Sequence, residues 1–153
     1  MAKIQQVLLI DPDFIKSITN ISNNTQDKFM HAAIRETTDI DLQEVIGTKL
    51  LNKLKTLIVE NTIGDDENVH YKELLDESKY FMAYSVVSRL VVISSVKIDN
   101  IGAKVTGDDK ATTLELKNIY NIESYYKEKA DFYKRRLQQF IRKNYEYYPE
   151  VMT

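Results

Sequence analysis

The chain has 153 residues, of which 43% are hydrophobic and 29% charged, a composition typical of a single soluble globular domain. Its 21 basic and 23 acidic side chains give a formal net charge of −2, whereas a protein that binds nucleic acid over a broad surface normally has a basic excess. Cysteine is absent, which excludes disulfides, thiol catalysis and cysteine-ligated metals, and the apolar run 7–10 is too short for a signal-peptide core or a membrane span.

Residues 1–30 predict an N-terminal arm or short helix. Asp11 suits the N-cap of a helix, and Pro12 suits the first helical position, where its missing N–H would have no partner in any case. We expect this helix to continue to Ile18 and to end at the polar cluster 20–25.

The following segment predicts three further helices. Apolar residues recur at three- and four-residue intervals over 27–37, which is the period of a helix. Thr38 and Asp41 have the spacing of a capping box, so a new helix is expected to begin there, and Gly47 suits the position that ends it. Thr48 is expected to cap the next helix. The apolar face of that helix consists of Leu50, Leu51, Leu54, Leu57 and Ile58.

A long, mainly apolar segment covers residues 71–95. Its first half has helical periodicity, whereas 86–96 is rich in β-branched residues, which also favour a buried strand. We favour a helix throughout, because no turn signal interrupts the segment. Beyond it, alternating stretches beside Gly102 predict a small β-hairpin over 96–106.

The C-terminal part predicts the longest helix, over 112–146. Thr112 and Glu115 have capping-box spacing, and the acid-before-base pair Glu123–Lys127 indicates an exposed face opposite the apolar one. At 1.5 Å per residue, about thirty residues form a rod of roughly 45–50 Å, so the helix is expected to span or overhang the domain. The apolar stripe consists of Ile119, Ile122, Tyr126, Ala130, Tyr133, Leu137 and Phe140 or Ile141. These elements predict one mainly α domain, a helical bundle with a long C-terminal helix and one small β-hairpin.

Motifs of catalysis and metal binding do not stand out. His31 and His70 have no neighbouring ligand pattern, and the acidic clusters 65–67 and 108–109 lack the alternating ligands of a calcium loop. Residues 102–107 contain the residue types of a phosphate loop in the wrong order. The sequence therefore predicts no enzyme, cofactor or metal.

Tyrosine is unusually frequent, with ten residues and no tryptophan, and six of the ten lie from Tyr125 onward. Tyr145, Tyr147 and Tyr148 follow the clear amphipathic pattern and precede the helix-stopping Pro149. Tyrosine combines a large apolar face with a polar tip, so it is enriched at interfaces. Partner contact and local packing both remain open for these three side chains.

A basic cluster occupies the end of the last predicted helix. It consists of Lys134, Arg135, Arg136, Arg142 and Lys143. A solvated helix face is the favoured interpretation, and contact with DNA or with an acidic partner surface is the alternative. That alternative predicts a small helical adaptor or regulator that binds DNA through its basic C-terminal helix.

Several segments together resemble one family. Residues 44–54, EVIGTKLLNKL, are similar to its LG-x-x-L-x-x-x-L segment, and a long apolar helix leads to the short turn 97–102. The aromatic pattern of 125–141 and the Tyr-Pro-Glu ending at 148–150 follow in the same order. Over residues 34–150 the chain resembles the head–tail connector (adaptor) proteins of tailed bacteriophages, and the resemblance is closest to the neck ring proteins of crAss-like phages of Bacteroidetes.

The resemblance implies a structural virion protein, made in the host cytoplasm, that forms a ring of usually twelve subunits in the phage neck. The implied partners are further copies of the chain, the portal protein and the next neck or tail protein. Genomic DNA would pass through the lumen without sequence-specific binding, and no membrane, cofactor or catalytic residue is implied. By their place in the chain, the assembly contacts are assigned to Ile98, Asn100, Ile101, Lys104, Val105, Tyr145, Tyr147, Tyr148 and Val151.

Overall fold

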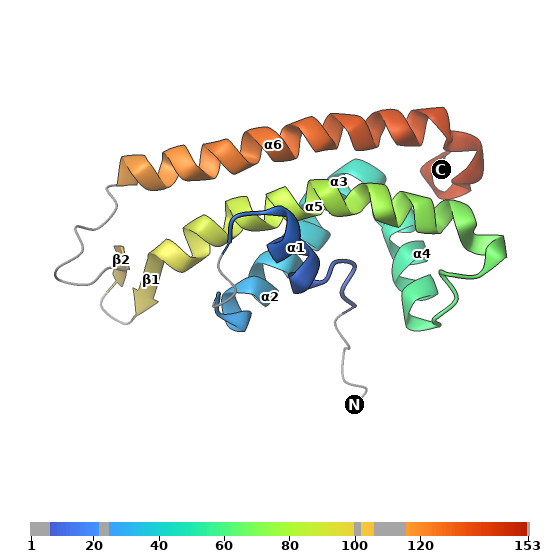
Figure 1. Ribbon diagram of the computed structural model, residues 1–153. Helices are drawn as coiled ribbons and strands as arrows, with labels where there is room; N and C mark the ends of the chain where they lie inside the picture. Colours follow the sequence, from blue (N-terminus) through green and yellow to red (C-terminus); the bar gives the residue numbers. More distant parts are fainter. Residues whose placement is uncertain (1–6, 22–24, 100–101, 106–115, 153) are drawn as a thin grey trace.

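Two long antiparallel helices, α5 (Val69–Ser95) and α6 (Leu116–Lys143), run the length of the molecule (Figure 1). The computed structural model describes residues 7–21, 25–99, 102–105 and 116–152. With 27 and 28 residues, both helices are about 40 Å long, so the expected span of the last helix is confirmed. The predicted cap at 112–115 and the loop at 107–109 lie outside the described residues.

The helix α5 is central, which explains its ambiguous sequence. α6 covers one side of it, and the helices α1 (Pro12–Ile18) and α2 (Asp27–Glu36) pack on other sides. The middle of the helix, residues 81–90, is buried on nearly every side, and β-branched residues such as Val86 and Val87 fill its core positions. The favoured helix is confirmed as far as Ser95.

The start of α1 follows the predicted chemistry. The side chain of Asp11 accepts a hydrogen bond of 2.9 Å from the backbone N–H of Asp13, and Pro12 occupies the first helical position. Ile15 is fully buried, so it anchors this short helix in the core.

The predicted capping box at Thr38 is wrong. Instead of restarting a helix, Thr38 lies inside a π-helical segment, η1 (Thr37–Leu42), which continues α2 without a break. Its hydroxyl donates to the carbonyl oxygen of Ile34 at 2.8 Å, four residues back, rather than accepting from a free N–H. Asp41, the other half of the expected box, forms an ion pair with Arg89.

Gly47 ends α3 (Gln43–Ile46) as predicted, and it does so with a φ of +82° that favours glycine. The expected cap at Thr48 is wrong, because α4 (Thr48–Val59) begins directly after Gly47. The Thr48 hydroxyl instead accepts a 2.7 Å hydrogen bond from the side-chain amide of Gln43.

The leucine face of α4 is buried as expected, and the connection to α5 contains a 3₁₀ turn, η2 (Asp66–Asn68). Beyond α5, the backbone of β1 (Val96–Asp99) pairs antiparallel with that of β2 (Gly102–Val105), with Val96 opposite Val105.

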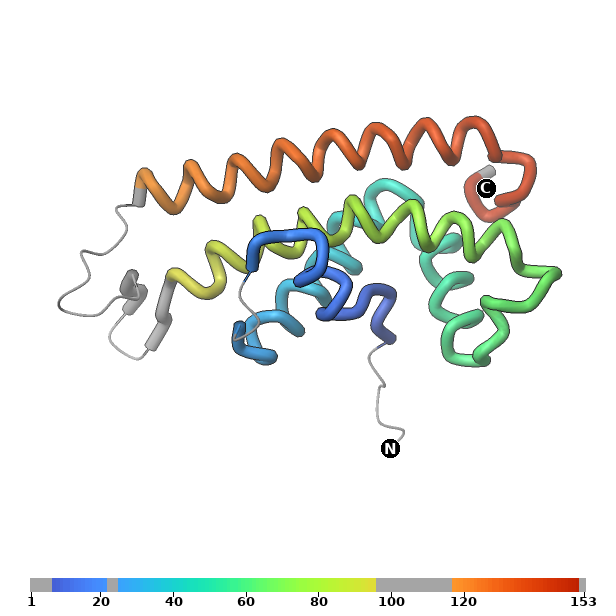
Figure 2. Tube along the Cα trace, in the orientation of Figure 1, coloured from blue at the N-terminus to red at the C-terminus, as the bar shows by residue number. Residues whose placement is uncertain are grey.

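The last helix ends at Lys143, not near residue 146. Two 3₁₀ turns follow it, η3 (Tyr145–Tyr147) and η4 (Pro149–Met152). They turn the C-terminal segment back toward α4 and the start of α5 (Figure 2).

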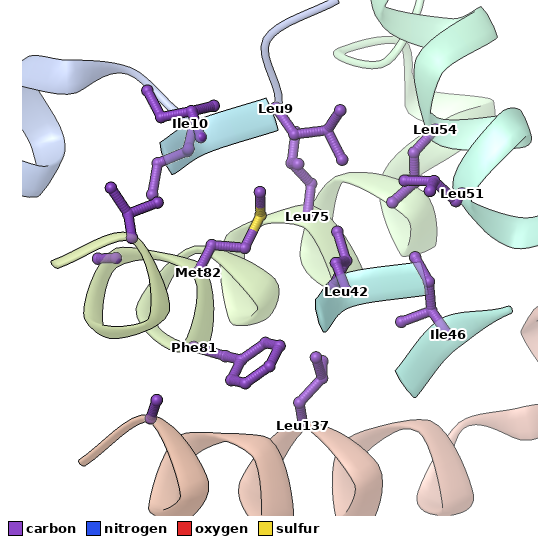
Figure 3. Packing of buried hydrophobic residues seen from close by; sticks show 14 of the residues in the cluster. Leu9, Ile10, Leu42, Ile46, Leu51, Leu54, Leu75, Phe81, Met82 and Leu137 are labelled. Atoms are coloured by element: carbon purple, nitrogen blue, oxygen red, sulfur yellow. The ribbon is translucent and has the colours of Figure 1, made fainter. Parts of the chain in front are cut away.

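The hydrophobic core draws on nearly every helix. Figure 3 shows Phe81 of α5 pointing toward Leu137 of α6, and Leu42 beside Leu75 and Ile46 in the same cluster. Ile119, Ala130, Leu137 and Ile141 of the predicted α6 stripe are buried, but Ile122 is 38% exposed, so the stripe is interrupted at that residue. Across the described ranges, no helix combines the length and apolar character needed to cross a bilayer.

Candidate interaction surfaces

The C-terminal turns are fixed to α5 through Tyr148. This side chain is fully buried, and its hydroxyl donates to the backbone oxygen of His70 at 2.7 Å. Its ring meets that of Tyr71 edge-on at 5.8 Å, and the Tyr71 hydroxyl donates to Glu150 Oε1 at 2.8 Å. Local packing is therefore the role of Tyr148, whose side chain belongs to the core of its own subunit and is not open to a partner.

The other predicted contacts of the tail remain at the surface. Tyr145, Tyr147 and Val151 are 55%, 41% and 41% exposed. The ring of Tyr147 stacks on that of His70 with the centroids 3.6 Å apart. Of the predicted contacts near the strands, Ile98, Lys104 and Val105 lie in β1 and β2, and Asn100 and Ile101 lie outside the described residues.

The tail contact makes stability sensitive to alkali. Burial, followed by the hydrogen bond and negative charge of Glu150, raises the pKa of Tyr71 from 10.0 to about 12. Burial also raises the pKa of Tyr148, with the charge of Glu73 and the neighbouring Tyr71 adding to the effect. Because the folded protein holds these phenol protons more tightly than the unfolded chain, their stabilising contribution is complete below pH 10 and is lost as the pH rises through 12.

We therefore expect the free energy of unfolding to fall steeply above pH 10, and Tyr71→Phe to make that fall shallower. Urea titrations of both proteins at a series of pH values test this. An equal slope for the two proteins would show that Tyr71 is not coupled to folding.

A second surface, which we call the aromatic flank, joins one side of α5 to one side of α6. Its rings belong to Phe14, Tyr80, Tyr84, Tyr125, Phe132 and Tyr133. Tyr133 lies between Tyr80 and Tyr84, nearly parallel to both, with centroid distances of 5.6 and 5.4 Å. Phe132 and Tyr125 are 55% and 51% exposed, so much of the flank faces solvent.

Cations cover the rings of the aromatic flank. Lys129 Nζ lies 5.7 Å from the ring centroid of Tyr84 and 4.8 Å from that of Tyr125. The guanidinium of Arg136 lies 6.0 and 5.9 Å from the centroids of Tyr80 and Tyr133, and Lys79 lies 6.0 Å from that of Phe14. Each placement is within range of a cation–π interaction. The flank therefore combines aromatic rings with cationic side chains.

A third feature, which we call the charged groove, lies between α6, α5 and the segment η1–α3. It has a volume of about 490 Å³ and an apolar floor that includes Phe81 and Ala130. Its carboxylates are Glu36, Asp41, Glu44, Glu123 and Asp131, and its cations are Arg89, Lys127 and Lys134. The carboxylates outnumber the cations, so the groove is acidic overall.

Arg89 organises the inner wall of the charged groove. Its Nε and Nη2 donate to the two carboxylate oxygens of Asp41 at 2.8 and 2.9 Å, and its Nη1 donates to Glu36 at 3.3 Å. The hydrogen bonds to Asp41 raise the pKa of Arg89 above its ordinary value. The π-helical segment η1 places Asp41 in this position, and π-helical turns are frequent at functional sites.

The first three residues of the predicted basic cluster do not share one face of α6. Successive helical residues point about 100° apart, so Lys134, Arg135 and Arg136 face three directions. Lys134 pairs with Glu44 at 3.8 Å, and Arg136 pairs with Glu77 at 3.5 Å. Lys134 therefore lines the charged groove and Arg136 the aromatic flank, and contact of the cluster with DNA stays a prediction.

The sequence contained a signal for the aromatic flank that the prediction missed. Tyr125 and Phe132 are seven residues apart, as are Tyr126 and Tyr133, so α6 carries two adjacent aromatic stripes. Only the second stripe entered the predicted core. The charged groove gave no comparable signal, because its residues come from parts of the chain that are distant in sequence.

Metal binding finds no support within the described ranges, where no cluster of three His, Asp or Glu side chains could hold an ion. His31 is exposed, and His70 is engaged by Tyr147.

The described residues define a mainly helical domain. The chain belongs to DUF6712, a family of unknown function that matches residues 42–153. No functionally curated protein and no solved structure is similar enough to match the chain.

Proposed function

We propose that this protein is a structural subunit of a tailed-phage neck, which forms a ring that joins the portal to the tail and continues the DNA channel. Its role in this proposal is assembly, not catalysis. The resemblance of residues 34–150 to head–tail connectors is the reason for proposing a neck ring and not another kind of assembly. The exposed aromatic flank is the observation that carries the proposal.

The flank supports a partner-binding role because its aromatic side chains stay exposed although other residues of the same helix form the core. Leu137 and Ala130 of α6 are buried, yet Phe132 and Tyr125 of the same helix remain more than half exposed. Aromatic side chains bury 150–250 Å² each and are enriched at interfaces, where they supply much of the binding energy. A contiguous group of them on a free subunit marks a surface that a partner covers.

The elongated shape also suits a ring subunit. Cyclic assemblies use a heterologous contact between two different surfaces, and the contact closes when the rotation between neighbours divides a full turn evenly. The long α5–α6 pair has an extended surface on each of its two sides, and these could form the two halves of such a contact. The proposed partners are further copies of the chain, the portal protein and the next neck or tail component.

Electron microscopy of the protein co-expressed with the portal of the same phage tests the proposal. We expect a ring of this chain seated on the portal, and native mass spectrometry should give a subunit number that divides or equals that of the portal ring. Phe132→Ala with Tyr125→Ala should prevent the ring, whereas Arg135→Ala, on the solvent side of α6, should leave it intact.

A chain that stays monomeric and does not bind the portal would contradict the proposal. DNA binding by the isolated protein at low salt would instead favour the regulator considered above.

A further inference from the structure

We propose that the aromatic flank of one subunit docks into the charged groove of the next, so that a second copy of this chain is the partner of both surfaces. The inference rests on the proposed self-assembly and names the contact through which it occurs.

The two surfaces lie on opposite sides of the molecule. On α5, Tyr80 of the flank and Arg89 of the groove are nine residues apart, which is about two and a half helical turns and places them on opposite faces. Phe132 of the flank and Glu123 of the groove have the same separation on α6. The helix α1, which contributes Phe14 to the flank, lies in front of α5 in Figure 1.

Opposite placement is what a closed ring requires. Each subunit in a cyclic assembly presents one surface to the preceding neighbour and a different, complementary surface to the following one. If both surfaces lay on the same side, the assembly would stop at a pair. The flank and the groove therefore have the arrangement of the two halves of a head-to-tail contact.

Their charges are complementary. The flank carries three cations, of which Lys79 pairs with Asp76 at 3.7 Å and Arg136 pairs with Glu77 at 3.5 Å, whereas Lys129 has no carboxylate partner within the described part of the chain. In the groove, Arg89 and Lys134 are engaged by carboxylates of their own subunit. The carboxylates of Glu123 and Asp131 form no ion pair with the described cations, so they are available to cations of a neighbour.

Shape and polarity agree with the charges. The groove volume of about 490 Å³ lies within the range of about 300–1,000 Å³ of sites that enclose small molecules, so an aromatic side chain fits. Its floor contains Phe81, Val92 and Ala130, which offer apolar contact to an entering Phe132 or Tyr125. Acidic side chains at the rim would meet the flank cations that surround these rings.

The flank is a poor partner for another copy of itself. A two-fold contact between two flanks would bring Lys129, which no described carboxylate neutralises, toward the cations of the other flank, and facing like charges are unfavourable. The structure thus favours a flank-to-groove contact over a symmetric dimer.

Thiol cross-linking tests the contact directly, because the natural chain contains no cysteine. Tyr125→Cys labels the flank, Lys127→Cys labels the groove and Arg135→Cys labels the solvent side of α6 as a control. We expect a short bis-maleimide reagent to join the first two variants when they are mixed. Each variant alone, and either one mixed with the control, should give little product.

Charge reversal gives the second test. Lys129→Glu damages only the flank and Asp131→Lys only the groove, so each should lose its multimers in native mass spectrometry while its thermal unfolding is unchanged. Mixed together, the two variants retain one intact flank and one intact groove between them. The reversed flank of one variant is again opposite in charge to the reversed groove of the other, so the mixture should regain the multimers that neither variant forms alone.

The outcomes separate this inference from the proposed function. Cross-links between two Tyr125→Cys chains would show that the flanks meet in a symmetric contact, and would contradict the head-to-tail one. Portal-bound rings that form equally well with Lys129→Glu and Asp131→Lys would overturn the contact but leave the ring. A wild-type chain that neither self-associates nor binds the portal would overturn both.

Discussion

Replacing Tyr148 by alanine is expected to lower the free energy of unfolding by about 3–5 kcal/mol, as for other large aromatic side chains removed from a packed core. The side chain is fully buried among residues of α5 and the C-terminal turns. Its loss leaves a cavity that this small fold cannot readily close, and it removes the 2.7 Å hydrogen bond to His70. Urea denaturation followed by circular dichroism measures the effect.

Two variants separate the causes of this loss. Tyr148→Phe keeps the ring and removes only the hydroxyl, so it should cost about 1 kcal/mol. Tyr145→Ala truncates a tyrosine three residues away that is 55% exposed, and it should change stability by less than about 0.5 kcal/mol. If Tyr148→Ala were no more damaging than Tyr145→Ala, the C-terminal turns would not be docked on α5.

The tail also shows how far the sequence could predict the site. Tyr145, Tyr147 and Tyr148 are nearly adjacent and chemically identical, so periodicity could not assign them to core or surface. Their roles depend on the direction in which the chain turns after Lys143, and two 3₁₀ turns set that direction. A tertiary contact with His70, 78 residues earlier, then selects Tyr148 for burial.

Local sequence signals predicted the helix ends correctly wherever no tertiary contact offered the same side chain another partner. Asp11 and Pro12 start α1, and Gly47 ends α3, because each residue satisfies a backbone requirement at its own position. Thr38 failed as a cap because its hydroxyl could bond to Ile34 within a continuous helix, and Asp41 was taken by Arg89. Local sequence signals therefore predicted where these helices begin and end. They failed where a side chain found a different hydrogen-bond or ion-pair partner.

The full extent of the aromatic flank and of the charged groove could not be predicted from the sequence, because each joins residues that are far apart in the chain. The flank joins Phe14 of α1 with rings 66 or more residues further along the chain, and the groove joins Glu36 with Asp131. Such sets become visible only once α5 and α6 are aligned. Lys134, Arg135 and Arg136, conversely, are adjacent in sequence but point in different directions, because a helix turns consecutive side chains about 100° apart.

Replacing Arg89 by methionine is expected to lower the free energy of unfolding by about 2–3 kcal/mol. The variant keeps much of the apolar length of the side chain but leaves Asp41 and Glu36 close together without their shared cation. The Arg89 and Asp41 side chains are only 28% and 25% exposed, so water replaces the lost hydrogen bonds incompletely. The estimate is below the value for a fully buried pair because of that remaining exposure.

The matched control breaks an ion pair on the same groove that is more open. Lys134 and Glu44 lie 3.8 Å apart, and Glu44 is 69% exposed, so Lys134→Met should change stability by less than about 0.5 kcal/mol. Adding Asp41→Asn to Arg89→Met removes one of the stranded charges and should restore part of the loss. If the double variant were less stable than Arg89→Met, repulsion between Asp41 and Glu36 would not be the cause. The contribution of Arg89 would then come from its packing between η1 and α5.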